Sequence, residues 1–107
     1  MERRVARAKQ KTVIAAVKDR LGRTIVLEQE RWDHISKHEQ LDGHELAVMR
    51  AVENADKRRD GNRPDREVIY GKDLGPNRWL AVVVEYDGLQ GRVITAYPHE
   101  KEPKTDR

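Results

Sequence analysis

Residues 78–86 constrain the fold most, because their side chains alternate in the way that a half-buried β-strand requires. One side would carry Leu80, Val82, Val84 and Tyr86, and the other Trp79, Ala81, Val83 and Glu85. Turn residues follow at positions 87–91, and residues 92–97 form a second β-prone run. The pattern therefore predicts a long antiparallel hairpin.

The rest of the chain predicts further strands and two helices. Residues 12–17 and 23–27 are β-prone runs on either side of a turn, which suggests a hairpin. A helix is expected from residue 28 to about 41, with Trp32 and Ile35 on one face, and a second from about 43 to 54. Residues 57–66 are typical of a loop that contains at most a short edge strand, and residues 67–70 of a short strand.

Together these elements predict an α+β fold, with two helices packed on one face of a four-stranded antiparallel sheet. The N-terminal part would add a helix or strands. Residues 1–10 would form a basic arm, residues 11–98 one domain and residues 99–107 a charged tail.

Composition narrows the function classes. The chain has 107 residues, 36% hydrophobic and 38% charged, so it can build only a thin core. It has no cysteine, which excludes disulfides, a thiolate nucleophile and a cysteine-based zinc site and fits a reducing cytoplasm. No apolar run approaches the ~18 residues of a membrane span, and no signal peptide is expected.

Basic residues concentrate in two places, although the net charge is only +3. Residues 1–11 hold five Lys or Arg and one acid, and residues 57–66 hold five Lys or Arg. Such runs are either solvated faces or phosphate contacts. The RNA-binding candidates are Arg58, Arg59, Arg63, Lys72, Tyr70 and Tyr97.

His34 and His38 lie four residues apart and so share one face of the first expected helix. They are a surface pair, a general acid–base pair, or two metal ligands, with His44 as a candidate third ligand. The hypothesis of a metal site is weakened because the zincin motif needs a Glu directly after the first His, and Ile35 occupies that position. We therefore expect no metal and no cofactor.

Three further residues are candidates for catalysis. Thr95 shares a strand face with Tyr97, which is either an ordinary exposed face or a polar platform that contacts phosphate and stacks on bases. Arg66 and Arg78 lie at the starts of expected strands, where a guanidinium would be held in place to stabilise a phosphorane-like transition state. Tyr70 either belongs to the same surface or packs inside.

These motifs resemble a known superfamily. The helix at residues 30–38, with a W-x-H-I-x-x-x-H pattern, and the strands at residues 79–86 and 93–98 are similar to the phage- and toxin-associated branch of the barnase–EndoU–colicin–RelE nucleases. The resemblance implies a metal-independent ribonuclease, in which the 2′-hydroxyl attacks the adjacent phosphate. It also implies that His34 or His38, Arg66 or Arg78, and Thr95 form the site. Glu39 stands where a proline often follows the second histidine in this family.

The sequence thus predicts a cytoplasmic endoribonuclease of toxin type, with RNA as substrate and an inhibitor protein as partner. The alternatives are a non-catalytic module that binds RNA or protein, and a metal-dependent hydrolase that uses His34 and His38.

Overall fold

The computed structural model describes residues 12–39, 41–72 and 78–103. In chain order the elements are β1 (Val13–Lys18), β2 (Thr24–Glu28), α2 (Gln29–Glu39), α3 (Glu45–Glu53), β3 (Lys57–Asp60), β4 (Arg66–Gly71), β5 (Trp79–Asp87) and β6 (Gln90–His99). The expected basic arm at residues 1–10 lies outside the described residues.

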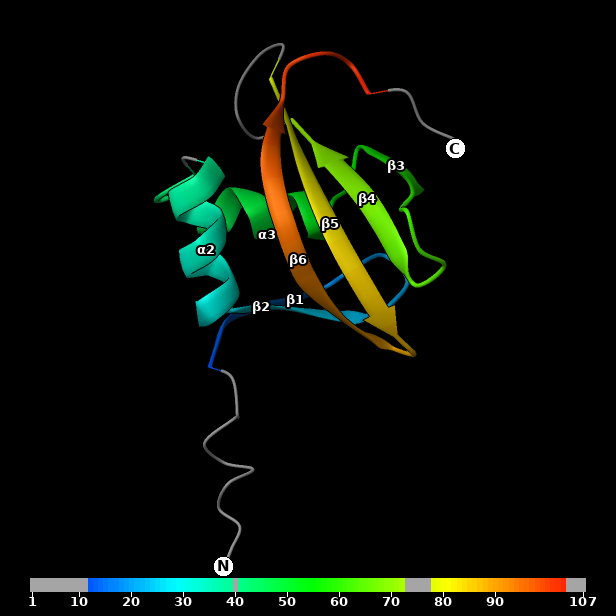
Figure 1. Ribbon diagram of the computed structural model, residues 1–107. Coiled ribbons are helices and arrows are strands. Elements are labelled where there is room, and N and C mark those ends of the chain that lie inside the picture. Colours follow the sequence, from blue (N-terminus) through cyan, green and yellow to red (C-terminus); the bar gives the residue numbers. More distant parts are fainter. Residues whose placement is uncertain (1–11, 40, 73–77, 104–107) are drawn as a thin grey trace, which may run out of the picture.

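The prediction of a four-stranded antiparallel sheet is wrong. The sheet is six-stranded and mixed, in the order β1-β2-β6-β5-β4-β3, although the fold is still α+β (Figure 1). The hairpin of β1 and β2 forms as expected, but β2 then pairs in parallel with β6, matching residues 24–26 to residues 90–92. β3 adds a sixth, antiparallel strand beside β4. The sequence could not give this order, because β2 and β6 are separated by most of the chain.

Local interactions fix the two hairpin turns. The Asp19 carboxylate accepts hydrogen bonds from the backbone N–H groups of Leu21 and Arg23, both at 2.9 Å, which closes the turn between β1 and β2. Gly88 has φ of 65° in the turn between β5 and β6, a conformation that other residues rarely adopt. The long β5–β6 ladder therefore begins at a tight turn and runs to the pair Trp79–His99.

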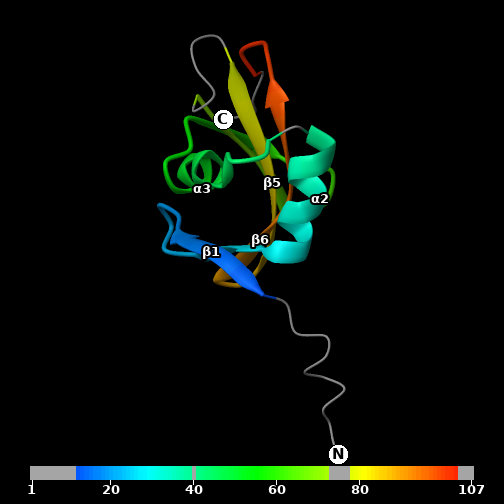
Figure 2. The ribbon, with the colours of Figure 1, turned by 90° about the vertical axis from the view of Figure 1, so that its left-hand side faces the viewer.

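Both helices contribute to one core. α2 packs along β6 and β2, while α3 lies behind the sheet across β4, β5 and β1 (Figures 1 and 2). Trp32 and Ile35 of α2 and Val48 and Val52 of α3 are buried with the alternate residues of the central strands. In the part of the chain that the structure describes, neither helix has the length and apolar character to cross a membrane.

The sheet residues that alternate with this core form its other side, which we call the second face. Its upper part holds a smaller buried cluster of Val68, Tyr70, Trp79 and Ala81. Register places further residues of β4, β5 and β6 on the same face: Arg66, Val83, Glu85, Arg92, Thr95, Tyr97 and His99. The second face carries no helix from the main core, so it is where polar side chains gather.

Candidate active site

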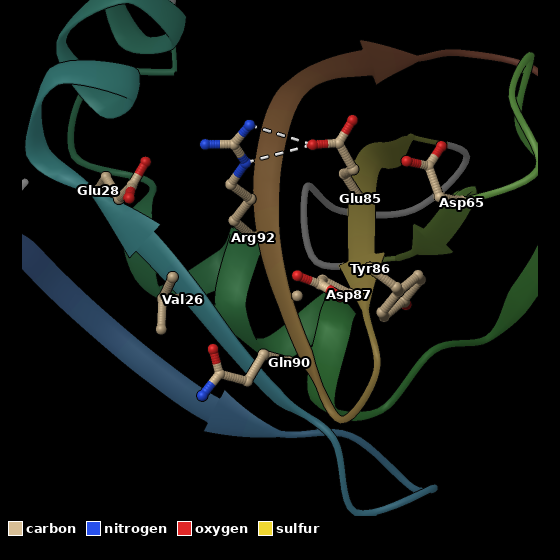
Figure 3. Close-up of a pocket in the computed structure, with 9 residues that line it drawn as sticks. Val26, Glu28, Asp65, Glu85, Tyr86, Asp87, Gln90 and Arg92 are labelled. Atoms are coloured by element: carbon tan, nitrogen blue, oxygen red, sulfur yellow. Dashed lines mark hydrogen bonds and ion pairs between the residues drawn. The ribbon is translucent and has the colours of Figure 1, made fainter.

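A cavity of about 530 Å³ opens on the lower part of the second face, between β2 and the turn end of the β5–β6 hairpin (Figure 3). Its lining residues come from β2, from the loop before β4, and from β5 and β6. They are Val26, Glu28, Asp65, Glu85, Tyr86, Asp87, Gln90, Gly91 and Arg92. The volume lies within the range of small-molecule binding sites.

Glu85 lies in this cavity between two arginines from the neighbouring strands. Arg92 Nη2 donates to Glu85 Oε1 at 3.1 Å, and Arg66 Nε donates to Glu85 Oε2 at 3.2 Å, so each carboxylate oxygen has its own guanidinium. The register explains the arrangement, because β5 places Glu85 opposite Arg66 on one side and Arg92 on the other. These hydrogen bonds, that of Arg92 first, hold the pKa of Glu85 below its ordinary value. Glu85 is therefore an anion at neutral pH.

The two arginines differ in how accessible they are. The Arg92 side chain is 43% exposed, against 21% for Arg66 and 19% for Glu85. Figure 3 shows the guanidinium of Arg92 between Glu28 and Glu85. Arg92 is thus the cation that an incoming anion meets first. The other carboxylates around the cavity, Glu28, Asp65 and Asp87, limit how much negative charge it can accept.

His34 lies next to this cavity. It lines a second hollow of about 300 Å³ together with Glu28, Glu30 and Arg31, and Glu28 also lines the main cavity. The rings of His34 and His38 lie 4.4 Å apart, and both side chains are exposed. Glu28 is therefore the residue that the His34 hollow and the main cavity share.

A network of contacts around Tyr86 forms the wall behind the cavity. The Tyr86 hydroxyl donates to Glu67 Oε1 at 2.9 Å, and the guanidinium carbon of Arg23 lies 3.8 Å from the centre of the Tyr86 ring. Burial and the adjacent Glu67 raise the pKa of Tyr86, so it stays a neutral donor. This network anchors the hairpin of β1 and β2 to β4 and β5, and it holds the strands that carry Glu85 and Arg92.

The upper part of the second face is basic and aromatic. Arg59 Nε donates to the Tyr70 hydroxyl at 2.9 Å, and Tyr97 interacts with the same guanidinium. The Tyr70 and His99 rings are 5.6 Å apart. Lys57 and Lys72 lie with their Nζ atoms 5.8 and 5.0 Å from the centre of the Trp79 ring. These side chains extend the polar surface from the cavity to the far end of the sheet.

The structure separates residues that the sequence had grouped. Arg78 precedes β5 and is exposed, seven residues from Glu85, or about 23 Å along a strand. It therefore lies at the opposite end of the sheet from Arg66. Thr95, half-buried, pairs with Val83 between these two ends.

The basic segment also divides between the two sides of the sheet. Arg58 lies on the core side, where its guanidinium is 3.7 Å from Glu67, whereas Arg59 lies on the second face. Arg63 lines a separate hollow in the loop between β3 and β4, together with Arg66. Tyr70 is only 3% exposed, so its hydroxyl contacts Arg59 while its ring packs inside.

Sequence reasoning missed Glu85, Arg92 and Glu28 as candidates. The alternation of side chains in residues 78–86 places Glu85 on the same strand face as Trp79, but a single acidic residue on a strand does not by itself indicate a functional site. The strand register would have found the site, because it sets an acid between two arginines on adjacent strands.

Among the described residues, no three His, Asp or Glu side chains gather closely enough to hold a metal ion. The His44 ring instead lies near its own loop, with Nδ1 3.1 Å from the carbonyl oxygen of Asp42. Comparison of the chain with family models, with curated proteins and with solved structures gave no match in any of the three.

Proposed function

We propose that the chain is a metal-independent endoribonuclease whose active site is the cavity around Glu85. One observation carries the proposal: a carboxylate held between two arginines, in an open cavity, with a histidine at its margin. Cleavage of RNA by its own 2′-hydroxyl needs a proton acceptor, a proton donor and stabilisation of negative charge, and these groups can supply all three.

In the proposed reaction, Glu85 accepts the proton of the 2′-hydroxyl as its oxygen attacks the adjacent phosphorus. Arg92 and Arg66 stabilise the additional negative charge on the phosphate oxygens. The bond from phosphorus to the 5′-oxygen breaks, and His34 donates a proton to that oxygen. The products are a 2′,3′-cyclic phosphate and a 5′-hydroxyl, and DNA is not cut because it lacks the nucleophile.

The ion pairs of Glu85 have a role in this scheme. While both arginines bind Glu85, its lowered pKa makes it a weak base. A phosphate that attracts Arg92 and Arg66 removes those hydrogen bonds and raises the basicity of Glu85 at the moment it is needed. Substrate binding thus activates the base.

The remaining candidates would serve in binding. Thr95 lies one step along the second face and would hydrogen-bond a phosphate or sugar oxygen. Arg59, Tyr97, Lys72 and Arg63 would contact the RNA strand on either side of the cut, whereas Arg78 lies too far from Glu85 to act in the reaction. Affinity for RNA should then fall steeply with salt. We further propose that the enzyme acts in the cytoplasm as a toxin, and that an inhibitor protein restrains it.

The test is incubation of the protein with single-stranded RNA in excess EDTA, followed by analysis of the ends. We expect cyclic-phosphate products, and a loss of about 10²–10⁴-fold in rate for Glu85→Gln and for His34→Ala. His44→Ala is the matched control, because His44 is also exposed but lies outside the site. Intact RNA at high protein concentration, or equal losses for His34→Ala and His44→Ala, would contradict the proposal.

A second candidate is a non-catalytic RNA-binding module. It is favoured by the completeness of the Arg66–Glu85–Arg92 pairing, which could be purely structural. This candidate predicts salt-sensitive RNA binding that weakens on substitution of Arg59 and Lys72, without any cleavage product. Ordinary RNA and the same strand with 2′-deoxyribose at each position separate the two candidates: the enzyme would cut the RNA and leave the 2′-deoxy strand intact, whereas the binding module would leave both intact.

A further inference from the structure

His34 and His38 form an exposed pair of imidazoles on α2. They are one helical turn apart, their ring centres are separated by 4.4 Å, and both side chains face solvent. Within the part of the chain that the structure describes, neither ring makes a hydrogen bond or an ion pair. The nitrogen atoms of both rings are therefore available to a ligand from solution.

The spacing of the two rings suits a single metal ion held between them. An imidazole nitrogen lies about 2.0–2.1 Å from a bound Zn²⁺, which places the ion roughly 3.2 Å from the ring centre. Two rings that meet the ion between a right angle and the tetrahedral angle then have centres roughly 4.5–5.2 Å apart. The observed 4.4 Å is within a small side-chain rotation of this range, and the ring planes are inclined by 47° rather than stacked face to face.

The charges beside the pair are compatible with a cation. Glu30 precedes His34 by one helical turn, so it lies on the same face of α2. Glu28 and Glu30 line the hollow of His34, and Arg31 offsets only one of these two carboxylates. Lys37 is exposed but lies on a different face of the helix, because adjacent residues point in different directions. The formal charge around His34 is therefore negative.

We propose that His34 and His38 chelate a divalent transition-metal ion, Zn²⁺ being the probe of choice, and that the bound ion inhibits the cleavage of RNA. Imidazole prefers Zn²⁺, Cu²⁺ and Ni²⁺, whereas Mg²⁺ and Ca²⁺ bind through oxygen. Among the described residues no third His, Asp or Glu completes a cluster, so water would fill the remaining positions on the ion. An open site of this kind can release its ion, as a reversible inhibitor requires.

The inhibition rests on the proposed function, in which His34 donates a proton to the departing 5′-oxygen. A metal ion binds a ring nitrogen through the same lone pair that would carry this proton, so metal binding and protonation exclude each other at that atom. The ion would also hold the ring of His34 beside that of His38. It takes no part in the reaction, which stays metal-independent; it removes the proton donor.

Calorimetric titration of the full chain with ZnCl₂, and with MgCl₂ for comparison, tests the metal site. We expect Zn²⁺ to bind and Mg²⁺ not to bind. His34→Ala and His38→Ala should each weaken Zn²⁺ binding by about tenfold or more, because the second imidazole no longer binds within the same molecule. His44→Ala is the matched control, since His44 is also exposed but has no histidine one turn away. Thermal unfolding checks that each variant is folded.

The rate of RNA cleavage at increasing Zn²⁺ concentration tests the inhibition. We expect His38→Ala to need about tenfold or more Zn²⁺ than the unmodified chain for the same fractional loss of its own metal-free rate.

The metal site is overturned if Zn²⁺ does not bind, if Mg²⁺ binds as well, or if His38→Ala and His44→Ala lose equal affinity. The inhibitory role is overturned if the chain with bound Zn²⁺ cuts RNA at its full rate. A chain that cuts no RNA under any condition would overturn the proposed function and the inhibitory role together, whereas the calorimetry decides the metal site independently.

Discussion

Gly91→Ala tests how tightly β6 is packed behind the candidate site. A β-carbon at Gly91 would lie 2.8 Å from Ile25 Cδ1 and 2.9 Å from Tyr86 Cδ1, closer than such atoms approach in folded proteins. Neither neighbour moves freely: Ile25 is completely buried, and Tyr86 is hydrogen-bonded to Glu67. The added methyl group must therefore displace packed atoms.

We expect Gly91→Ala to lower the free energy of unfolding by about 1–3 kcal/mol, the usual cost of overpacking a close-packed site. Each kcal/mol should lower the Tm of a domain of this size by roughly 4–8 °C. Urea denaturation followed by circular dichroism measures the change in the free energy of unfolding directly. If the dependence of that free energy on urea concentration is unchanged, both proteins expose the same amount of surface on unfolding.

The companion variant Ile25→Val removes the atom that lies nearest to the new methyl group. Alone it should cost about 0.5–1.5 kcal/mol. Combined with Gly91→Ala it should cost less than the sum of the two, by about 0.5 kcal/mol or more, because the residues are in contact. If Gly91→Ala leaves the stability unchanged, or if the two effects add, the packing described around Gly91 is refuted.

Three further predictions, with four substitutions, test the parts of the fold that support the site. Asp19→Asn removes a carboxylate whose pKa is raised by burial but lowered more by its hydrogen bonds. The stability that this carboxylate contributes should be present at neutral pH and lost as the pH falls below 3.8. Urea denaturation of both proteins across this pH range measures the difference. Tyr86→Phe should cost about 1–3 kcal/mol, because Glu67 loses a buried hydrogen bond, and a neutral result would mean that the network does not anchor the hairpin. Leu80→Ala should cost about 2–5 kcal/mol and Leu46→Ala no more than about 0.5, since Leu80 is fully buried and Leu46 is 66% exposed.

The sequence predicts those parts of the fold that depend on neighbours along the chain. Alternation in residues 79–87 and a glycine turn suffice for the β5–β6 hairpin, and Trp32 and Ile35 suffice for the buried face of α2. The parallel pairing of β2 with β6 could not be predicted, because no local pattern encodes which distant strand an edge will meet. That pairing joins the β1–β2 hairpin to the other strands in one mixed sheet.

In the candidate site, too, the sequence predicts the features that depend on neighbours along the chain but not those that depend on strand pairing. Histidines four residues apart on a helix can be recognised from spacing alone, and His34 and His38 do lie together. The association of Glu85 with Arg66 and Arg92 depends on the register of three strands, which the sequence does not reveal. Likewise, the sequence places both Arg66 and Arg78 at the starts of expected strands and does not distinguish them. The structure places them at opposite ends of the sheet, because β5 runs antiparallel to β4.

The central position of β6 has a consequence for how the protein is made. β6 follows every other described strand in the sequence, yet it lies between β2 and β5, so the β1–β2 hairpin cannot join the rest of the sheet until β6 has been synthesised. Arg92 pairs with Val26 across that junction, and Glu28 lines the same cavity. A nascent chain therefore cannot assemble the cavity before β6 has been synthesised.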